Sequence, residues 1–149
     1  MTMSLTSSSF PDGGEIPQKF GKKIQNVSPQ LSWGDAPPET RSFALALVDT
    51  HPIANGYVHW LVVDIDAATT SLPEGAADGA MPTGSRELTP YAGPFPPSGT
   101  HAYELTLYAL DTETTALPAN VPLAEFQARI SDRTLATARM IGEFTKMPQ

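Results

Sequence analysis

Cysteine is absent from the chain, and positive charge is scarce. Without cysteine there can be no disulfide bond and no thiolate metal site. Nine lysine and arginine residues against sixteen acidic ones give a net charge of −7, and no basic cluster is longer than Lys22-Lys23. Nucleic acids and anionic membrane surfaces are bound by basic stripes, so we expect neither as a partner. One small anion in a local pocket is compatible with this charge, because a pocket depends on its own lining.

Long hydrophobic runs are also absent. The most apolar stretches, FALALV and WLVVDI, are far shorter than the roughly 20 residues of a membrane-spanning helix. The opening residues, MTMSLTSSSF, have neither the basic start nor the apolar stretch of a signal peptide. The sequence therefore predicts a cytoplasmic protein with no integral membrane association.

What the chain does contain is an ordinary share of hydrophobic residues, 40%, and many prolines, 15 against 11 glycines. A chain of 149 residues can bury about two-thirds of its unfolded surface, so we expect a single domain over residues 1–149. Prolines spread along the chain are typical of rigid turns between short strands.

Alternation of apolar and polar residues predicts strands at 28–33, 42–49, 58–65 and 101–110. The segment 66–98 holds many glycine, proline, alanine and threonine residues and little periodicity. We expect it to be mostly loop, with at most one short strand.

Helical spacing appears only near the end of the chain. Residues 123–130 carry apolar side chains at helical intervals and follow Pro122, which suits the first turn of a helix. Ser131 or Asp132 is placed to cap a second helix over residues 134–144. Strands first and helices last, with hairpin-length connections, predict a mainly β, antiparallel fold with peripheral C-terminal helices.

Three of the predicted strands carry polar side chains at one end of an apolar face. Asp49 ends such a face on the second strand, and His59 begins one on the third. His101 and Tyr103 begin the face of the last strand. An antiparallel hairpin through residues 50–57 would bring Asp49 and His59 to the same rim of the core. The apolar residues of the three faces are Phe43, Leu45 and Leu47; Leu61, Val63 and Ile65; and Leu105 and Leu107.

Each polar residue also has a purely structural interpretation. A single inward histidine usually finds a partner in the core, an aspartate after a strand can cap the next turn, and a tyrosine can simply pack. Their convergence on one rim favours a small polar hollow instead. Protonated imidazoles attract an anion, Asp49 can orient one of them, and backbone N–H groups beside Gly93 and Gly99 add fixed donors.

Two sharper chemistries would use the same residues. The histidines 51, 59 and 101 together with Asp49 have the types of a two-histidine, one-carboxylate metal site, but their spacing matches no known motif. Ser28 or Ser98 with His101 and Asp49 could form a hydrolytic triad, although the chain has no G-x-S-x-G turn.

A proline loop leads directly into H-x-Y: residues 93–103 read G-P-x-P-P-x-G-x-H-x-Y. Other short motifs run in order along nearly the whole chain: F-x-D-G-x-x-I-P at 10–17, S-P-x-L-S-W at 28–33, S-F-A-L at 42–45, V-H-W at 58–60, L-Y-A-L-D at 107–111 and I-G-E-F at 141–144. In these motifs the chain resembles the phosphatidylethanolamine-binding protein family, which includes Raf-kinase-inhibitor-like proteins and a prokaryotic branch.

The resemblance implies an antiparallel β-sandwich-like core with peripheral helices and a small pocket for phosphate-like groups, including phospholipid headgroups. The residues that fall on the family's pocket are Asp49, His59, His101 and Tyr103, with Gly93, Pro94, Pro96 and Pro97 as its proline-loop wall. Two departures bear on one wall: the family's D-P-D-x-P reads D-T-H-P at 49–52, and the usual Y-T-C-D-G of the prokaryotic branch is replaced by FGKKI at 20–24. His51 lies outside the matched motifs, so we expect its loss to leave anion binding nearly unchanged.

We therefore expect a non-enzymatic protein that binds a small anionic or phosphorylated ligand, such as a phospholipid headgroup, with no cofactor and no metal. A second interpretation is an interaction module that inhibits a kinase or hydrolase through the pocket rim. A weaker third is a hydrolase. The sequence does not define the oligomeric state, and a homodimer is one of the open alternatives.

Two physical expectations concern the pocket. An aromatic residue before proline in a tight loop predicts a cis peptide bond within residues 93–97, at Phe95-Pro96. If His59 and His101 hold an anion as imidazolium ions, the anion raises their pKa values, and its affinity falls about tenfold or more between roughly pH 6 and 8.

Overall fold

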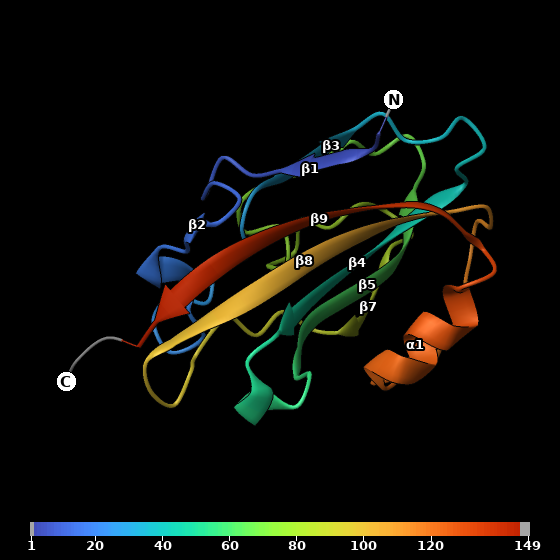
Figure 1. The fold of residues 1–149 in the computed structure, drawn as a ribbon. Helices are drawn as coiled ribbons and strands as arrows, with labels where there is room; N and C mark the ends of the chain where they lie inside the picture. Colours follow the sequence, from blue (N-terminus) through green and yellow to red (C-terminus); the bar gives the residue numbers. More distant parts are fainter. Residues whose placement is uncertain (1, 147–149) are drawn as a thin grey trace.

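In the described residues, 2–146, two β-sheets stack face to face and one α-helix covers the outer face of the larger sheet (Figure 1). This computed structural model has the strands β1 (Ser4–Thr6), β2 (Gly14–Glu15), β3 (Leu31–Gly34), β4 (Ser42–Asp49), β5 (Val58–Asp66), β6 (Ser71–Leu72), β7 (Arg86–Thr89), β8 (Thr100–Leu110) and β9 (Thr134–Thr145). Its helical segments are η1 (Gln18–Phe20), η2 (Pro52–Ala54) and α1 (Leu123–Ile130).

The larger sheet has the strand order β2-β9-β8-β4-β5-β7, and the smaller has the order β1-β3-β6. Neighbouring strands are antiparallel, apart from β2 and β9, which are parallel. The predicted fold class, mainly β with an antiparallel, sandwich-like core, is confirmed.

Two hydrophobic clusters hold the layers together. The larger lies between the sheets, where Leu5 and Trp33 of the small sheet pack with Leu45 and Leu105 of the large one. The second lies beneath α1 and includes Phe126 of that helix and the alanines of β4. Because β4 is covered on both faces, nearly every position of its sequence is apolar.

Strands β4 and β8 have the inward faces that the alternation predicts. Their register pairs Leu47 with Leu105 and then Asp49 with Tyr103. The apolar stripe of the central strands therefore ends in a facing pair of polar side chains at one end of the large sheet.

On β5 the alternation is interrupted at His59. Leu47 of β4 pairs with Trp60, but the next residue, Val48, pairs with Val58, so His59 is an extra residue in a β-bulge. A bulge turns two consecutive side chains toward one face of a sheet. His59 and Trp60 accordingly both lie on the side of the inter-sheet core, which is the side of Asp49.

The prediction that Leu61 and Val63 share the inward face of His59 is therefore wrong. Trp60 and Val62 belong to the core between the sheets, while Leu61 and Val63 pack beneath α1. A second register shift, between Val62 and Ile65, returns Ile65 to the inter-sheet core, as predicted.

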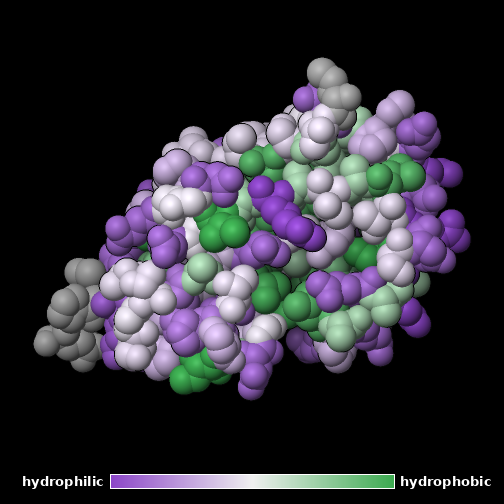
Figure 2. All heavy atoms as spheres, in the orientation of Figure 1, coloured by the Kyte–Doolittle hydropathy of each residue, from purple (hydrophilic) through white to green (hydrophobic). Residues whose placement is uncertain are grey.

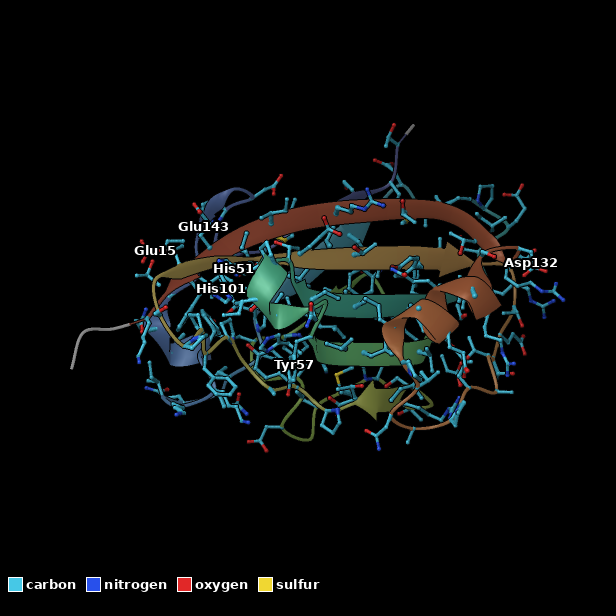
Figure 3. The ribbon with its side chains drawn as sticks, turned by 60° about the horizontal axis from the view of Figure 1, so that its bottom comes forward. Glu15, His51, Tyr57, His101, Asp132 and Glu143 are labelled. Atoms are coloured by element: carbon cyan, nitrogen blue, oxygen red, sulfur yellow. The ribbon has the colours of Figure 1, made fainter. Side chains whose placement is uncertain are left out.

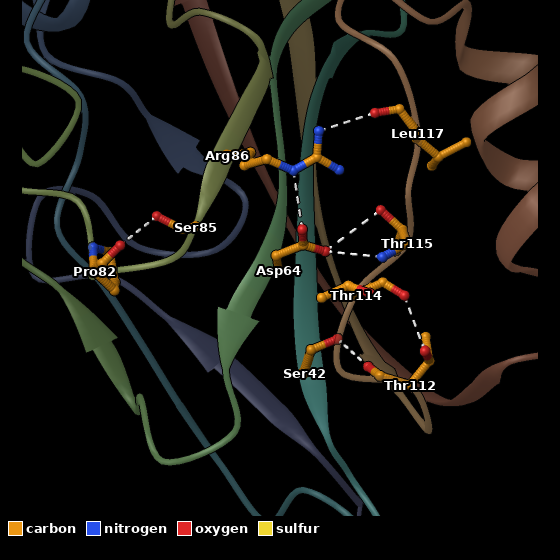
Figure 4. Close-up of polar contacts among 9 residues, drawn as sticks. All are labelled: Ser42, Asp64, Pro82, Ser85, Arg86, Thr112, Thr114, Thr115 and Leu117. Carbon is orange, nitrogen blue, oxygen red and sulfur yellow. Dashed lines mark hydrogen bonds and ion pairs between the residues drawn. The ribbon is translucent and has the colours of Figure 1, made fainter.

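Asp64 occupies this second irregularity, with a φ of 61°. Its carboxylate accepts hydrogen bonds from Arg86 Nε and from the backbone N–H of Thr115, each at 3.0 Å (Figure 4). Arg86 also donates to the carbonyl of Leu117 at 3.0 Å. One carboxylate thus joins β5 to the edge strand β7 and to the loop before α1.

The first predicted C-terminal helix is confirmed as α1, but the second, over 134–144, is wrong. These residues form β9, which pairs with β8 along its length. Ala138 and Met140 are buried while Arg139 and Glu143 are exposed, the period of a strand. Pairing with β8 buries this face, and such tertiary contacts outweigh local helix propensity.

Shorter elements differ in extent. The strand predicted at 28–33 begins later, at Leu31, and the segment 66–98 contains the two short strands β6 and β7.

The predicted cis bond at Phe95-Pro96 is also wrong, since no peptide bond within residues 2–146 is cis. The proline loop turns at Gly93, where a Cβ atom would lie 1.9 Å from the carbonyl oxygen of Phe20. This close approach is available only to glycine, and the loop is held by the Lys22 N–H, which donates to the Pro94 carbonyl at 3.1 Å.

Candidate functional site

Four predicted site residues meet at one end of the large sheet. Asp49 is the last residue of β4, His59 lies in the bulge of β5, and His101 and Tyr103 open β8. All four are at least 95% buried. Buried polar side chains need partners, so their hydrogen bonds define what the site can do.

Asp49 and His101 form a buried pair. His101 Nδ1 lies 2.6 Å from Asp49 Oδ2, and Asp49 Oδ1 accepts the backbone N–H of His51 at 2.9 Å. An ionised carboxylate only accepts hydrogen bonds, so Nδ1 of His101 carries a proton and Nε2 is the atom left for a ligand.

His59 is held in the same way by a different acceptor. Its Nδ1 lies 2.6 Å from the carbonyl oxygen of Ala92, which can only accept, so Nδ1 donates. Burial lowers the pKa of His59, although the Ala92 hydrogen bond and the negative charge of Asp49 act against it. The positive charge of Lys22 lowers the pKa of His59 further.

Tyr103 stands between the two imidazoles without lining the cavity itself. Its ring packs edge-on against His59, with centroids 5.2 Å apart, and lies 6.4 Å from His101. Burial, with a smaller effect from Asp49, raises the pKa of Tyr103, so the phenol stays protonated. Within the described residues no hydrogen bond of ordinary geometry reaches its buried hydroxyl, although Asp49 lies near enough to act on the pKa of the phenol.

His51 is a site residue that the sequence did not assign to the pocket. Its ring stacks on His101 with centroids 3.9 Å apart and planes within 8°, and Figure 3 shows the two side by side at one end of β8. Nδ1 of His51 accepts the N–H of Ile53 at 3.2 Å and so caps η2. The available signal was a histidine directly before Pro52, because proline favours the first position of a helical turn.

Asp49, His59 and His101 border a cavity of about 280 Å³. Its lining residues are Asp49, Ile53, Ala54, Tyr57, His59, Phe95, Pro97 and His101. Of the predicted proline-loop wall, only Pro97 lines this cavity, whereas Pro94 and Pro96 line a separate groove. Gly93 acts as an anchor: its N–H donates to Asn26 Oδ1 at 2.7 Å.

Neither the metal site nor the hydrolytic triad is complete at this position. Within residues 2–146, no group of three or more histidine, aspartate or glutamate side chains is placed to hold a metal ion. Ser28 Oγ accepts the N–H of Ala77 and borders a different hollow, and Ser98 has no hydrogen bond to His101 in the same part of the chain.

Comparisons with known proteins bear on the family and the fold of this chain. A family model described as phosphatidylethanolamine-binding protein matches residues 6–145. A UPF0098 protein of Methanothermobacter thermautotrophicus is 34% identical over 151 residues, which cover 97% of this chain and 99% of that protein. The crystal structure of Escherichia coli YbcL, described as a new member of the mammalian PEBP family, matches with a TM-score of 0.87 at 28% identity and covers 99% of this chain and 100% of YbcL.

A relative in Mycobacterium tuberculosis, LppC, carries a name that marks it as a candidate lipoprotein. It is 33% identical over 150 residues, covering 95% of this chain and 72% of LppC. Among residues 2–146 of the present chain, no helix has the length and apolar character needed to cross a bilayer.

Proposed function

Because this chain belongs to the phosphatidylethanolamine-binding protein family, we propose that it binds a small phosphate-bearing or other anionic ligand in the cavity beside His59 and His101, without chemical turnover. The observation that carries this proposal is that both imidazoles are fixed through Nδ1, one by the Ala92 carbonyl and one by the Asp49 carboxylate. Each ring therefore keeps Nε2 for a ligand, and each donates from Nε2 when it is protonated.

The charges around the cavity support an anion. The Asp49 carboxylate lies 2.6 Å from His101 Nδ1, so a ligand anion at Nε2 would meet a ring whose other side faces an opposite charge. Lys22 lies near enough to act on the pKa of His59, which places a further positive charge near the cavity. The cavity volume, about 280 Å³, is at the lower end of small-molecule pockets and suits a phosphate or headgroup better than a whole lipid.

Binding without turnover is favoured by the partners of the two histidines. A hydrolase of the serine type needs a nucleophile in hydrogen-bond contact with its histidine. In a serine-type triad the histidine Nδ1 is bonded to a carboxylate, as it is in His101, and the nucleophile is bonded to Nε2. Within the described residues no hydroxyl forms a hydrogen bond with Nε2 of His101 or of His59.

A protein-interaction role through the rim is the second candidate. Ile53 is 67% exposed and Tyr57 is 50% exposed, and both border the cavity mouth. Stable protein interfaces usually need a contiguous apolar patch, whereas Figure 2 shows hydrophobic surface broken into small patches on the face it presents. This favours the small ligand as the first candidate. A cytoplasmic location stays a prediction, and cell fractionation tests it.

Calorimetric titration with inorganic phosphate and with phosphoethanolamine at about pH 6 tests the proposal. We expect binding to the wild type and a loss of about tenfold or more in each of His59→Gln and His101→Gln, since one charged hydrogen bond contributes about 1.5–3 kcal/mol. Asp132→Asn, at the far end of the molecule in Figure 3, is the matched surface control. Absence of phosphate binding, or hydrolysis of phosphate or carboxylate esters that disappears in His59→Gln, would contradict it.

A further inference from the structure

A second, larger groove shares the walls Phe95 and Pro97 with the histidine cavity. Its volume is about 590 Å³, well within the range of small-molecule sites. We propose that this groove binds an apolar carboxylate, a molecule with an aliphatic or aromatic body and one negative charge, independently of the ligand of the histidine cavity. Its lining residues are Gln18, Gly21, Lys23, Ile24, Pro94, Phe95, Pro96, Pro97, Phe144 and Lys146.

The body of the groove is apolar and preformed. Proline rings make up one wall, and Ile24 and Phe95 leave 51% and 38% of their surface exposed to water. Gly21 lets the backbone approach Phe144 closely, since a Cβ there would lie 2.6 Å from the end of that ring. Rigid proline and glycine backbone reduces the entropy that a ligand loses on ordering the site.

The charge of the groove is opposite to that of the whole protein. Of the four lysines in the chain, Lys23 and Lys146 line this groove, and Lys22 lies over the ring of its wall residue Phe95. The ammonium groups of Lys22 and Lys23 lie 4.7 and 5.4 Å from the centre of the Phe95 ring, and Lys146 Nζ donates to the Pro97 carbonyl at 3.0 Å.

No carboxylate neutralises these lysines in the part of the chain that the structure describes. Among the described residues no acidic side chain lines the groove, and Glu74, which pairs with Lys19, contacts a lysine outside it. An apolar wall with uncompensated ammonium groups at its edge is complementary to one class of ligand, an apolar body that carries an anion. A bare phosphate would leave the apolar wall unused, and an apolar cation would be repelled.

Octanoate is the probe, titrated by calorimetry into the full-length protein. Octylammonium has the same body with the opposite charge, and acetate has the charge without the body. We expect octanoate to bind at least about tenfold more tightly than either comparator, because only octanoate gains from both burial of methylene groups and an opposite charge.

Two variants with matched controls locate the binding. Ile24→Glu places a negative charge in the groove and should weaken octanoate binding about tenfold, while Leu135→Glu, a similarly exposed residue on β9, should not change it. The double variant Lys23→Gln/Lys146→Gln should lose about two- to fivefold for each lysine, and Lys19→Gln should lose nothing.

Saturating phosphate separates the two sites. If the groove is an independent site, phosphate and His59→Gln leave octanoate affinity unchanged, whatever the histidine cavity binds. Competition between octanoate and phosphate, equal losses in Ile24→Glu and Leu135→Glu, or equal affinity for octanoate and octylammonium would each overturn the proposal.

Discussion

The imidazole rings of His51 and His101 lie parallel, with centroids 3.9 Å apart. A single carboxylate fixes both: Asp49 Oδ2 accepts from the His101 ring, and Asp49 Oδ1 accepts from the His51 backbone. The D-T-H-P segment that departs from the family pattern thus covers one face of a central pocket residue. We therefore expect His51 to act as a positioning residue, contrary to the prediction from the sequence that its loss has almost no effect.

His51→Ala should weaken phosphate binding about two- to fivefold, because it removes the ring that holds His101 in place. His51→Phe should restore the affinity, since phenylalanine can stack on His101 without accepting the Ile53 N–H. Titration calorimetry on both variants distinguishes the roles. Equal losses in the alanine and phenylalanine variants would show that the imidazole itself matters rather than the stacking.

Asp49→Asn should reduce phosphate affinity about tenfold or more at about pH 6. Asparagine can still accept a hydrogen bond from His101, but it cannot compensate the positive charge of a buried imidazolium, and a charged hydrogen bond contributes about 1.5–3 kcal/mol. Asp132→Asn controls for the loss of one surface charge. Unchanged affinity in Asp49→Asn would mean that His101 does not bind the anion in its charged form.

Tyr103→Phe should raise the stability of the ligand-free protein by about 1–2 kcal/mol. The Tyr103 hydroxyl is buried and lacks a hydrogen-bond partner among the described residues, and such a group costs about 1–3 kcal/mol. Chemical denaturation measures the change. Tyr91→Phe is the control with the opposite expectation, because the Tyr91 hydroxyl donates to the Phe20 carbonyl at 2.9 Å. A stability loss in Tyr103→Phe would reveal a partner for its hydroxyl.

Asp64→Ala should destabilise the fold by about 2–4 kcal/mol. The substitution removes the acceptor of Arg86 and of the Thr115 N–H. It also places alanine in the left-handed backbone region, at a φ of 61°, where alanine is less stable than aspartate. Asp64→Gly should lose less stability than Asp64→Ala, because glycine adopts a positive φ without strain. Asp64→Asn should also lose less, because asparagine can still accept some of the hydrogen bonds. Denaturation of the three variants separates the two contributions; equal losses in all three would assign the effect to the Arg86 ion pair alone.

The sequence predicts those parts of the fold in which the two-residue alternation of a strand continues without a bulge. Along β4 and β8 successive side chains point to opposite faces without interruption, so the inward faces predicted for these two strands are observed, and the register of the strands adds the pairing of Asp49 with Tyr103. On β5 two bulges break the alternation, and nothing in the residues of that strand announces an extra residue. The pattern of residues 134–144 is compatible with either a helix or a strand. They form a strand because their backbone pairs with β8 along its whole length, a contact that the local sequence does not show.

The same distinction holds for the site. Asp49 and His101 were predicted because each stands at the end of an apolar stripe, and His59 because it precedes apolar residues that the bulge divides between the two faces of the sheet. His51 was not, because its position depends on the turn at η2 rather than on any strand. The way the proline loop borders two hollows is a tertiary property as well: Pro94 and Pro96 line only the larger groove, whereas Phe95 and Pro97 stand between the groove and the histidine cavity and line both.

The last prediction concerns pH and His59. Burial lowers the pKa of His59 below its ordinary value of 6.5, against the opposing effects of Ala92 and Asp49. In the ligand-free protein the unfolded chain therefore binds this proton more readily than the folded one. The stability that depends on His59 is fully present above about pH 6.5 and is lost as the pH falls through the folded-state pKa. A bound anion favours the imidazolium and so raises the pKa of His59.

Anion affinity consequently has the opposite pH dependence to ligand-free stability. It is highest below the free-state pKa of His59 and falls as the pH rises through the bound-state pKa, so the window extends to lower pH than the sequence alone predicts. Sulfate is the suitable probe because its own charge is constant over this range. We expect its affinity to fall about tenfold or more between about pH 5 and about pH 8, and His59→Gln to flatten both this fall and the acid loss of stability. A sulfate affinity independent of pH in the wild type would mean that the anion is held by groups other than the histidines.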